Sequence, residues 1–133
     1  MPDLSKFKNL TQIYIYGEGR TRDCSAISNV ESLVGLELSS VNLTGNMPNI
    51  SKLKNLKTLN LRGNYLNNED IKKILDLKEN TNLTINLTKN SITDATVLLA
   101  LNPNTKINLS ENVNLSQDSK NKLKVRFGNN VTF

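Results

Sequence analysis

The sequence predicts an α/β solenoid of about six units, with parallel strands on its concave face and short turns, then helices, on its convex face. Two observations predict this fold. An apolar pattern recurs along nearly the whole chain at steps close to 23 residues, and two residue types dominate, with 21 Leu and 22 Asn among 133 residues. Patterned repetition at such a period is typical of repeat proteins, and 133 residues make one domain at most.

The repeat is clearest in two consecutive stretches whose apolar positions lie 23 residues apart. They are Ile27, Val30, Leu33, Leu36, Leu38 and Leu43, followed by Ile50, Leu53, Leu56, Leu59, Leu61 and Leu66. One step back, Leu4, Phe7, Leu10, Ile13 and Ile15 occupy the matching places. Later units keep only the predicted strand core, in the pairs Ile85 and Leu87, Ile107 and Leu109, and Val125 and Phe127, at steps of 26, 22 and 18 residues.

The unit reads L-x-x-L-x-x-L-x-x-L-x-L-x-x-N-x-L, and residues 53–66 are its best copy. This pattern resembles the leucine-rich repeat family. The resemblance implies that the two strand leucines point inward and that a buried Asn in each unit bonds the backbone of neighbouring turns. Asn64, Asn90, Asn112 and Asn130 stand in that place, whereas Glu18 and Val41 replace it in the first two units.

The segments that return between strands change along the chain. The early spacing, in which every third residue is apolar, suits single 3₁₀ turns. After Leu66, Asn67 and Asn68 are candidate helix caps ahead of Ile71, Ile74 and Leu75. Two further helices are expected over residues 93–101 and 116–123. We therefore expect true helices behind the later strands.

Catalytic chemistry is poorly represented in the composition, so we expect no enzyme, cofactor or metal site. The sequence has no His and one cysteine, Cys24, which we interpret as a small loop residue. The carboxylates Asp70, Asp76 and Glu79 alternate with lysines in a predicted helix and indicate a solvated face. Eight Asn-x-Ser/Thr sites follow from the abundance of these residue types, and we interpret them as compositional.

The net charge of +5 is spread over the chain, which argues against nucleic-acid binding. A basic cluster near the end is formed by Lys120, Lys122, Lys124 and Arg126. If Val125 and Phe127 face the core, Lys124 and Arg126 project on the concave face next to Lys106. These cations would then bind an acidic partner or, as we favour, discourage sheet-to-sheet aggregation at an edge strand.

The predicted concave face is the surface on which repeat proteins bind partners. Its first column, between the strand leucines, is Tyr14, Glu37, Asn60, Asn86, Asn108 and Arg126. Its second is Tyr16, Ser39, Arg62, Thr88, Ser110 and Gly128. Tyr and Arg are enriched among interface anchors, so the expected ligand contacts are Tyr14, Tyr16, Glu37, Arg62 and Lys106, with Lys124 and Arg126 as a further basic group. The three central amides either bind a polar ligand or bond to one another along the sheet.

The resemblance extends to the internalin-like repeats of Gram-positive bacterial surfaces, because the units are 22–23 residues long, free of cysteine and rich in Lys and Asn. It implies a non-catalytic adhesion module that binds a protein or glycan at the cell surface. Residues 1–133 are then expected to be one domain of a longer protein, with the secretion signal and anchor elsewhere; a complete short protein is the alternative. A cytoplasmic scaffold or adaptor, or the recognition domain of a larger enzyme, are the alternatives. No apolar run is long enough to span a membrane.

Overall fold

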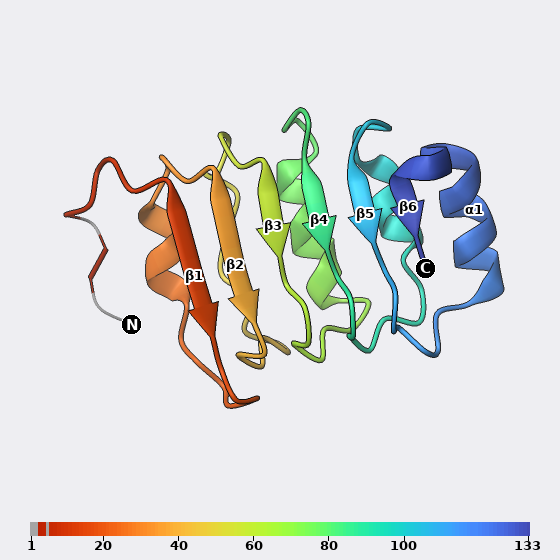
Figure 1. Cartoon of the computed structure of the whole chain (residues 1–133), viewed down its shortest axis with the longest axis horizontal. Coiled ribbons are helices and arrows are strands. Elements are labelled where there is room, and N and C mark those ends of the chain that lie inside the picture. Colours follow the sequence, from red (N-terminus) through yellow and green to blue (C-terminus); the bar gives the residue numbers. More distant parts are fainter. Residues whose placement is uncertain (1–2, 5) are drawn as a thin grey trace.

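The computed structural model describes residues 3–4 and 6–133. Within them, six strands form one parallel sheet and lie side by side in chain order (Figure 1). They are β1 (Gln12–Tyr16), β2 (Gly35–Ser39), β3 (Thr58–Asn60), β4 (Thr84–Asn86), β5 (Lys106–Asn108) and β6 (Val131–Thr132). Each strand pairs with the next in parallel, so every connection crosses over to return to the same end of the sheet.

The helical segments lie behind the strands, and α1 (Gln117–Phe127) stands beside β6 at the C-terminal end (Figure 1). The described residues form four 3₁₀ helices, η1 (Ser25–Asn29), η2 (Asp70–Leu77), η3 (Thr96–Ala100) and η4 (Gly128–Asn130), and one α-helix, α1 (Gln117–Phe127). η3 packs against both η2 and α1. The other face of the sheet carries no helix of the described residues, and we call it the exposed sheet face.

The buried strand residues confirm the predicted spacing of the repeat from β2 to β5. Leu36 pairs with Leu59, Leu59 with Ile85 and Ile85 with Ile107, and all four side chains are buried. Leu38, Leu61, Leu87 and Leu109, two residues further on, are buried as well. Burial of apolar surface in this continuous column is the main stabilising contribution that the strands receive.

Two of the expected α-helices are 3₁₀ helices instead. The buried residues of η2 are spaced by three, at Ile71, Ile74 and Leu77, whereas Leu75 is only half-buried. Side chains three apart align on one side of a 3₁₀ helix, so this spacing favours the tighter form. Ala95, Leu98 and Leu101 repeat the pattern around η3. The prediction of a short 3₁₀ turn early in the chain is confirmed by η1.

The sixth strand was placed wrongly by the sequence pattern. Val131, and not Val125, pairs with Ile107, while Val125 lies in α1 and is 90% exposed. The reason is a strong helix start, in which the Ser116 side chain accepts a hydrogen bond from the Ser119 amide. Leu123 and Phe127, four residues apart, form the buried side of α1, and the predicted third helix therefore extends through Phe127.

Three buried asparagines tie successive turns together, as the resemblance implied. Asn64 Oδ1 accepts from the Val41 amide at 2.9 Å, and its Nδ2 donates to the Leu38 carbonyl. Asn90 Oδ1 accepts from the Asn64 and Leu66 amides, each at 3.0 Å. Asn112 repeats the arrangement one strand later. Asn130 is no part of this series, because it precedes β6 instead of following it.

The turn after each middle strand also recurs in backbone conformation. Ser40, Gly63, Lys89 and Glu111 all have a positive φ, between 55° and 68°. These positions follow one another at 23, 26 and 22 residues, the same steps as the core leucines. Since a positive φ is unusual for a residue other than glycine, its return at one place in four turns shows that the chain repeats a local structure as well as an apolar pattern.

Candidate functional site

The exposed sheet face is built from the residues that alternate with the buried strand residues. Its central row consists of residues aligned across the six strands: Tyr14, Glu37, Asn60, Asn86, Asn108 and Thr132. The first five were predicted, and Thr132 takes the place predicted for Arg126. Successive side chains in the row stand about 4.8 Å apart, because that is the distance between neighbouring strands.

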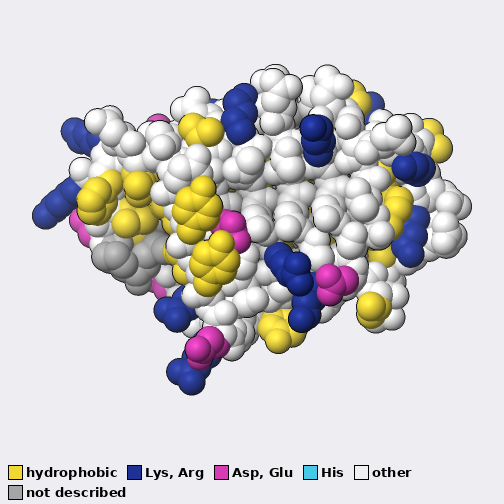
Figure 2. Space-filling view, viewed as in Figure 1, with side chains coloured by type: hydrophobic (Ala, Val, Ile, Leu, Met, Phe, Trp, Pro, Cys, Tyr) yellow, Lys and Arg dark blue, Asp and Glu magenta, His cyan; other side chains and the backbone are white. Residues whose placement is uncertain are grey.

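The N-terminal part of this face carries its aromatic side chains. Tyr14 and Tyr16 are 62% and 66% exposed, and apolar side chains gather over this end of the molecule (Figure 2). The Tyr14 hydroxyl donates to Gln12 Oε1 at 3.1 Å. Glu37 accepts a hydrogen bond from the Tyr16 hydroxyl and thereby raises the pKa of Tyr16. Tyr14, Tyr16 and Glu37 therefore form one contact group.

Arg62 stands just beyond the end of β3, two residues after the row. Its guanidinium lies 3.8 Å from Glu111 Oε1, and both side chains are about half exposed. Such an exposed ion pair holds its members weakly. Arg62 is thus available to an external carboxylate or hydroxyl group, although it is separated from the tyrosines by β2.

The predicted amide row does not bond to itself. Each oxygen is used locally instead, since Asn60, Asn86 and Asn108 accept from the backbone amides of Arg62, Thr88 and Ser110 at 3.1, 2.9 and 3.0 Å. None of the three Nδ2 groups donates a hydrogen bond to the residues that the structure describes. The row consequently presents three amide donors to the outside in the same register.

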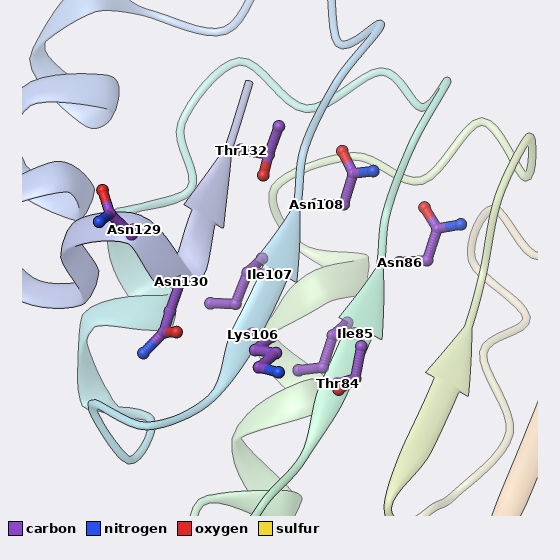
Figure 3. A pocket seen from close by; sticks show the side chains of 9 residues that line it. All are labelled: Thr84, Ile85, Asn86, Lys106, Ile107, Asn108, Asn129, Asn130 and Thr132. Carbon is purple, nitrogen blue, oxygen red and sulfur yellow. The ribbon is translucent and has the colours of Figure 1, made fainter.

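A hollow of about 480 Å³ opens on this face over β4, β5 and β6 (Figure 3). Thr84, Asn86, Lys106, Asn108 and Thr132 border it, and Asn129 and Asn130 of η4 close one side. Lys106 makes no ion pair with the described part of the chain. The sequence prediction missed the threonines and η4, because it considered only two columns of the face and misplaced the last strand.

Lys124 and Arg126 are not on the exposed sheet face. Both belong to the last turn of α1, and the Arg126 Nη2 donates to the Leu101 carbonyl at 3.1 Å. There they complement the negative end of the helix. The structure therefore brings Tyr14, Tyr16, Glu37, Arg62 and Lys106 to one face and separates Lys124 and Arg126 from them, which overturns both interpretations of a basic edge strand.

Cys24 and Asp70 are both buried. Cys24 lies in the loop before η1, as expected, but its side chain is buried, and burial raises the pKa of its thiol. Asp70 is buried rather than solvated, and its two carboxylate oxygens accept from the amides of Gly45 at 2.8 Å and Asn67 at 3.0 Å. Residues 3–4 and 6–133 contain no group of three or more potential acidic, Cys or His metal ligands.

No helix among the described residues has the length and apolar character needed to cross a membrane. Comparison of the sequence with protein families gives no match, and comparison with curated proteins gives none either.

Proposed function

We propose that this chain is a leucine-rich repeat module that binds a protein or glycan through the exposed sheet face and performs no catalysis. The observation that carries the proposal is the division of the molecule into two sides. Helical segments occupy one side, and the other presents an unbroken parallel row of polar and aromatic side chains, from Tyr14 on β1 to Thr132 on β6.

Membership of the leucine-rich repeat family is supported by three features that recur together. The buried strand residues, the buried asparagines and the positive-φ turns follow the same steps along the chain. An arrangement of stacked similar units creates an extended binding surface without a deep pocket. This surface suits recognition of a large ligand better than turnover of a small one.

A cell-surface location is part of the proposal and rests on the resemblance to internalin-like repeats. In this setting the module contributes adhesion or host interaction within a longer protein. Fractionation of cells that make the native protein tests the location. Recovery with the cell wall or medium supports a surface role, whereas recovery only in the cytoplasm would favour the intracellular adaptor.

The binding face is tested with two charge reversals of similar exposure. Arg62→Glu lies on the exposed sheet face, and Lys72→Glu lies on η2, where Lys72 pairs with exposed Glu69. Both proteins should melt within a few degrees of the wild type, since exposed substitutions usually change stability by less than about 0.5 kcal/mol. Binding to intact animal and bacterial cells is then measured by flow cytometry.

We expect Arg62→Glu to reduce cell binding and Lys72→Glu to leave it unchanged. A loss confined to the Lys72 variant would move the site to the helical side of the molecule. Equal binding by all three proteins would remove the support for the exposed sheet face.

A further inference from the structure

We propose that β1 is a dimerisation edge, at which a second copy of this chain pairs its own β1 antiparallel across a two-fold axis at Tyr14. β1 forms one end of the sheet and, among the described strands, pairs with β2 alone. Pairing at this edge extends the sheet and leaves its exposed face uncovered, so it is independent of the ligand proposed for that face. The two exposed sheet faces then point to the same side and form one bivalent surface.

The outer side of β1 carries backbone groups that are available for pairing. The Gly17 amide, just after the strand, donates to the Ser39 carbonyl at 3.0 Å, so the odd-numbered residues of β1 turn their backbone groups toward β2. Because these groups alternate between the two sides of a strand, the N–H and C=O groups of Gln12, Tyr14 and Tyr16 point away from β2. Within the described part of the chain, none of them bonds to the backbone of a turn, loop or helix.

The opposite edge of the sheet is protected, whereas the β1 edge is not. β6 is only two residues long, and α1 stands beside it (Figure 1). β1 is five residues long and contains no charged residue and no proline. Proteins usually protect a strand edge of this kind with charges, proline or a covering element. The β1 edge therefore has the properties of a strand-pairing surface, and β6 of a second copy is too short to cover it.

A second copy of β1 matches this edge along its whole length. When Tyr14 stands opposite Tyr14 of the second copy, Gln12 stands opposite Tyr16, and each such pair exchanges both of its backbone hydrogen bonds. All outward N–H and C=O groups of both strands are then bonded. The two Tyr14 rings are neighbours on the exposed side, and Ile13 faces the half-buried Ile15 on the inner side. Aromatic and β-branched cross-strand pairs of this kind stabilise a sheet.

The charges that flank β1 favour the antiparallel arrangement. Lys8 is the last charged residue before the strand and Glu18 is the first after it, and both are exposed. Antiparallel pairing brings the end of one strand that leads to Glu18 toward the end of the other that follows Lys8. Parallel pairing of two β1 strands would bring like charges together, in copies that already repel each other through a net charge of +5. These matches are properties of β1 itself, so we assign a second copy and not a strand of another protein.

Sedimentation velocity of the whole chain tests the pairing. We expect the wild type to pass from monomer to dimer across about a hundred-fold range of concentration. Tyr14→Lys should remain monomeric over the same range, because it places two like charges opposite each other at the axis. The matched control is Thr58→Lys, at an exposed position of β3 in the interior of the sheet, and it should dimerise as the wild type does. Circular dichroism verifies that both variants are folded.

Disulfide cross-linking tests the register without relying on charge. Residues at the axis have Cα atoms about 5.5 Å apart, within the range of about 4.4–6.8 Å that a disulfide requires. Tyr14 and Tyr16 are similarly exposed, at 62% and 66%, but the two copies of residue 16 are offset by roughly 13 Å along the strands. Under mild oxidation, Tyr14→Cys should form a covalent dimer at least about ten-fold faster than Tyr16→Cys. Cys24 is buried in both variants and serves as a common background.

Several results would overturn the dimer. They are a wild type that stays monomeric at every concentration, a Tyr14→Lys variant that still dimerises, a Thr58→Lys variant that does not, and equal cross-linking at positions 14 and 16. Association beyond a dimer would also contradict it, because pairing across a two-fold axis is closed. Each of these results leaves the proposed function standing, since the effect of Arg62→Glu on cell binding tests that separately.

Discussion

Single asparagines have two different tasks in this chain, and their burial separates them. Asn64 is fully buried and serves backbone groups of the preceding turn, whereas Asn60 is half-exposed and serves only its own turn. Removal of a buried side chain that satisfies backbone groups leaves those groups without partners. Each such unpaired group costs about 1–3 kcal/mol.

Asn64→Ala should therefore destabilise the protein more than Asn60→Ala. We expect a loss of at least about 1–3 kcal/mol for the first and about 1 kcal/mol or less for the second. Urea unfolding followed by circular dichroism provides both values. The opposite ranking would mean that the assignment of buried and exposed positions around β3 is wrong.

Cys24 provides a second test at the level of one residue. Its side chain is 2% exposed, and burial raises the pKa of the thiol, so little reactive thiolate is available. Native protein should react with iodoacetamide far more slowly than protein in denaturant. Equally fast alkylation in both conditions would show that the segment around Cys24 is open to solvent.

Between elements, one carboxylate connects η3 to α1. Asp94 Oδ1 accepts from the Thr96 amide at 2.8 Å, the Thr96 hydroxyl at 2.7 Å and the Ser119 hydroxyl at 3.0 Å. The hydrogen bond from the Thr96 amide is the largest cause that holds the pKa of Asp94 below its ordinary value of 3.8, and the Thr96 hydroxyl adds to it. The charged form is thus favoured by folding.

A lowered pKa in the folded state fixes the direction of the pH effect. The contribution of Asp94 is complete above its ordinary pKa of 3.8 and is lost as pH falls through the lower folded value. Asp94→Asn should be less stable than the wild type at neutral pH, and the difference should narrow below pH 3.8. Thermal melts of both proteins across this range measure it, and a constant difference would contradict the role of the charge.

Substitutions of two apolar residues, one buried and one exposed, test the placement of the C-terminal helix α1. Leu123 is buried, whereas Val125 is 90% exposed on α1. Leu123→Ala should cost about 2–5 kcal/mol, as buried Leu truncations do, and Val125→Ala should change stability by less than about 0.5 kcal/mol. If denaturant unfolding ranked Val125 as the costlier position, the sixth strand would have to be moved back to residues 125–127.

Across the whole molecule, the sequence pattern predicts the first five strands and fails at the last. Leu36, Leu59, Ile85 and Ile107 are found by their period because each occupies the same buried position. Val125 and Phe127 share the two-residue spacing of a strand, yet Leu123 and Phe127 also share the four-residue spacing of a helix. The N-cap at Ser116 favours the helix over the strand. A pattern of apolar residues alone does not contain this cap.

Part of the candidate site could likewise be predicted from the sequence and part could not. Tyr14, Tyr16, Glu37, Arg62 and Lys106 follow from strand alternation, which determines the side of the sheet that each residue occupies. The hollow does not follow from it, because Asn129 and Asn130 reach it from η4 only after α1 has been completed. The hydrogen bonds from backbone amides to the oxygens of Asn60, Asn86 and Asn108 could not be predicted either. Composition does not distinguish an amide that caps a turn from one that bonds to its neighbour.

Lysine labelling of the chain bound to intact cells tests the central claim, that the exposed sheet face is the binding surface. Lys106 lies on this face, Lys72 on η2 and Lys124 on α1, and all three are exposed in the free protein. Acetylation with and without cells, quantified by mass spectrometry, compares them within one molecule. The account predicts protection of Lys106 alone, whereas protection of Lys72 or Lys124 with Lys106 still labelled would contradict it.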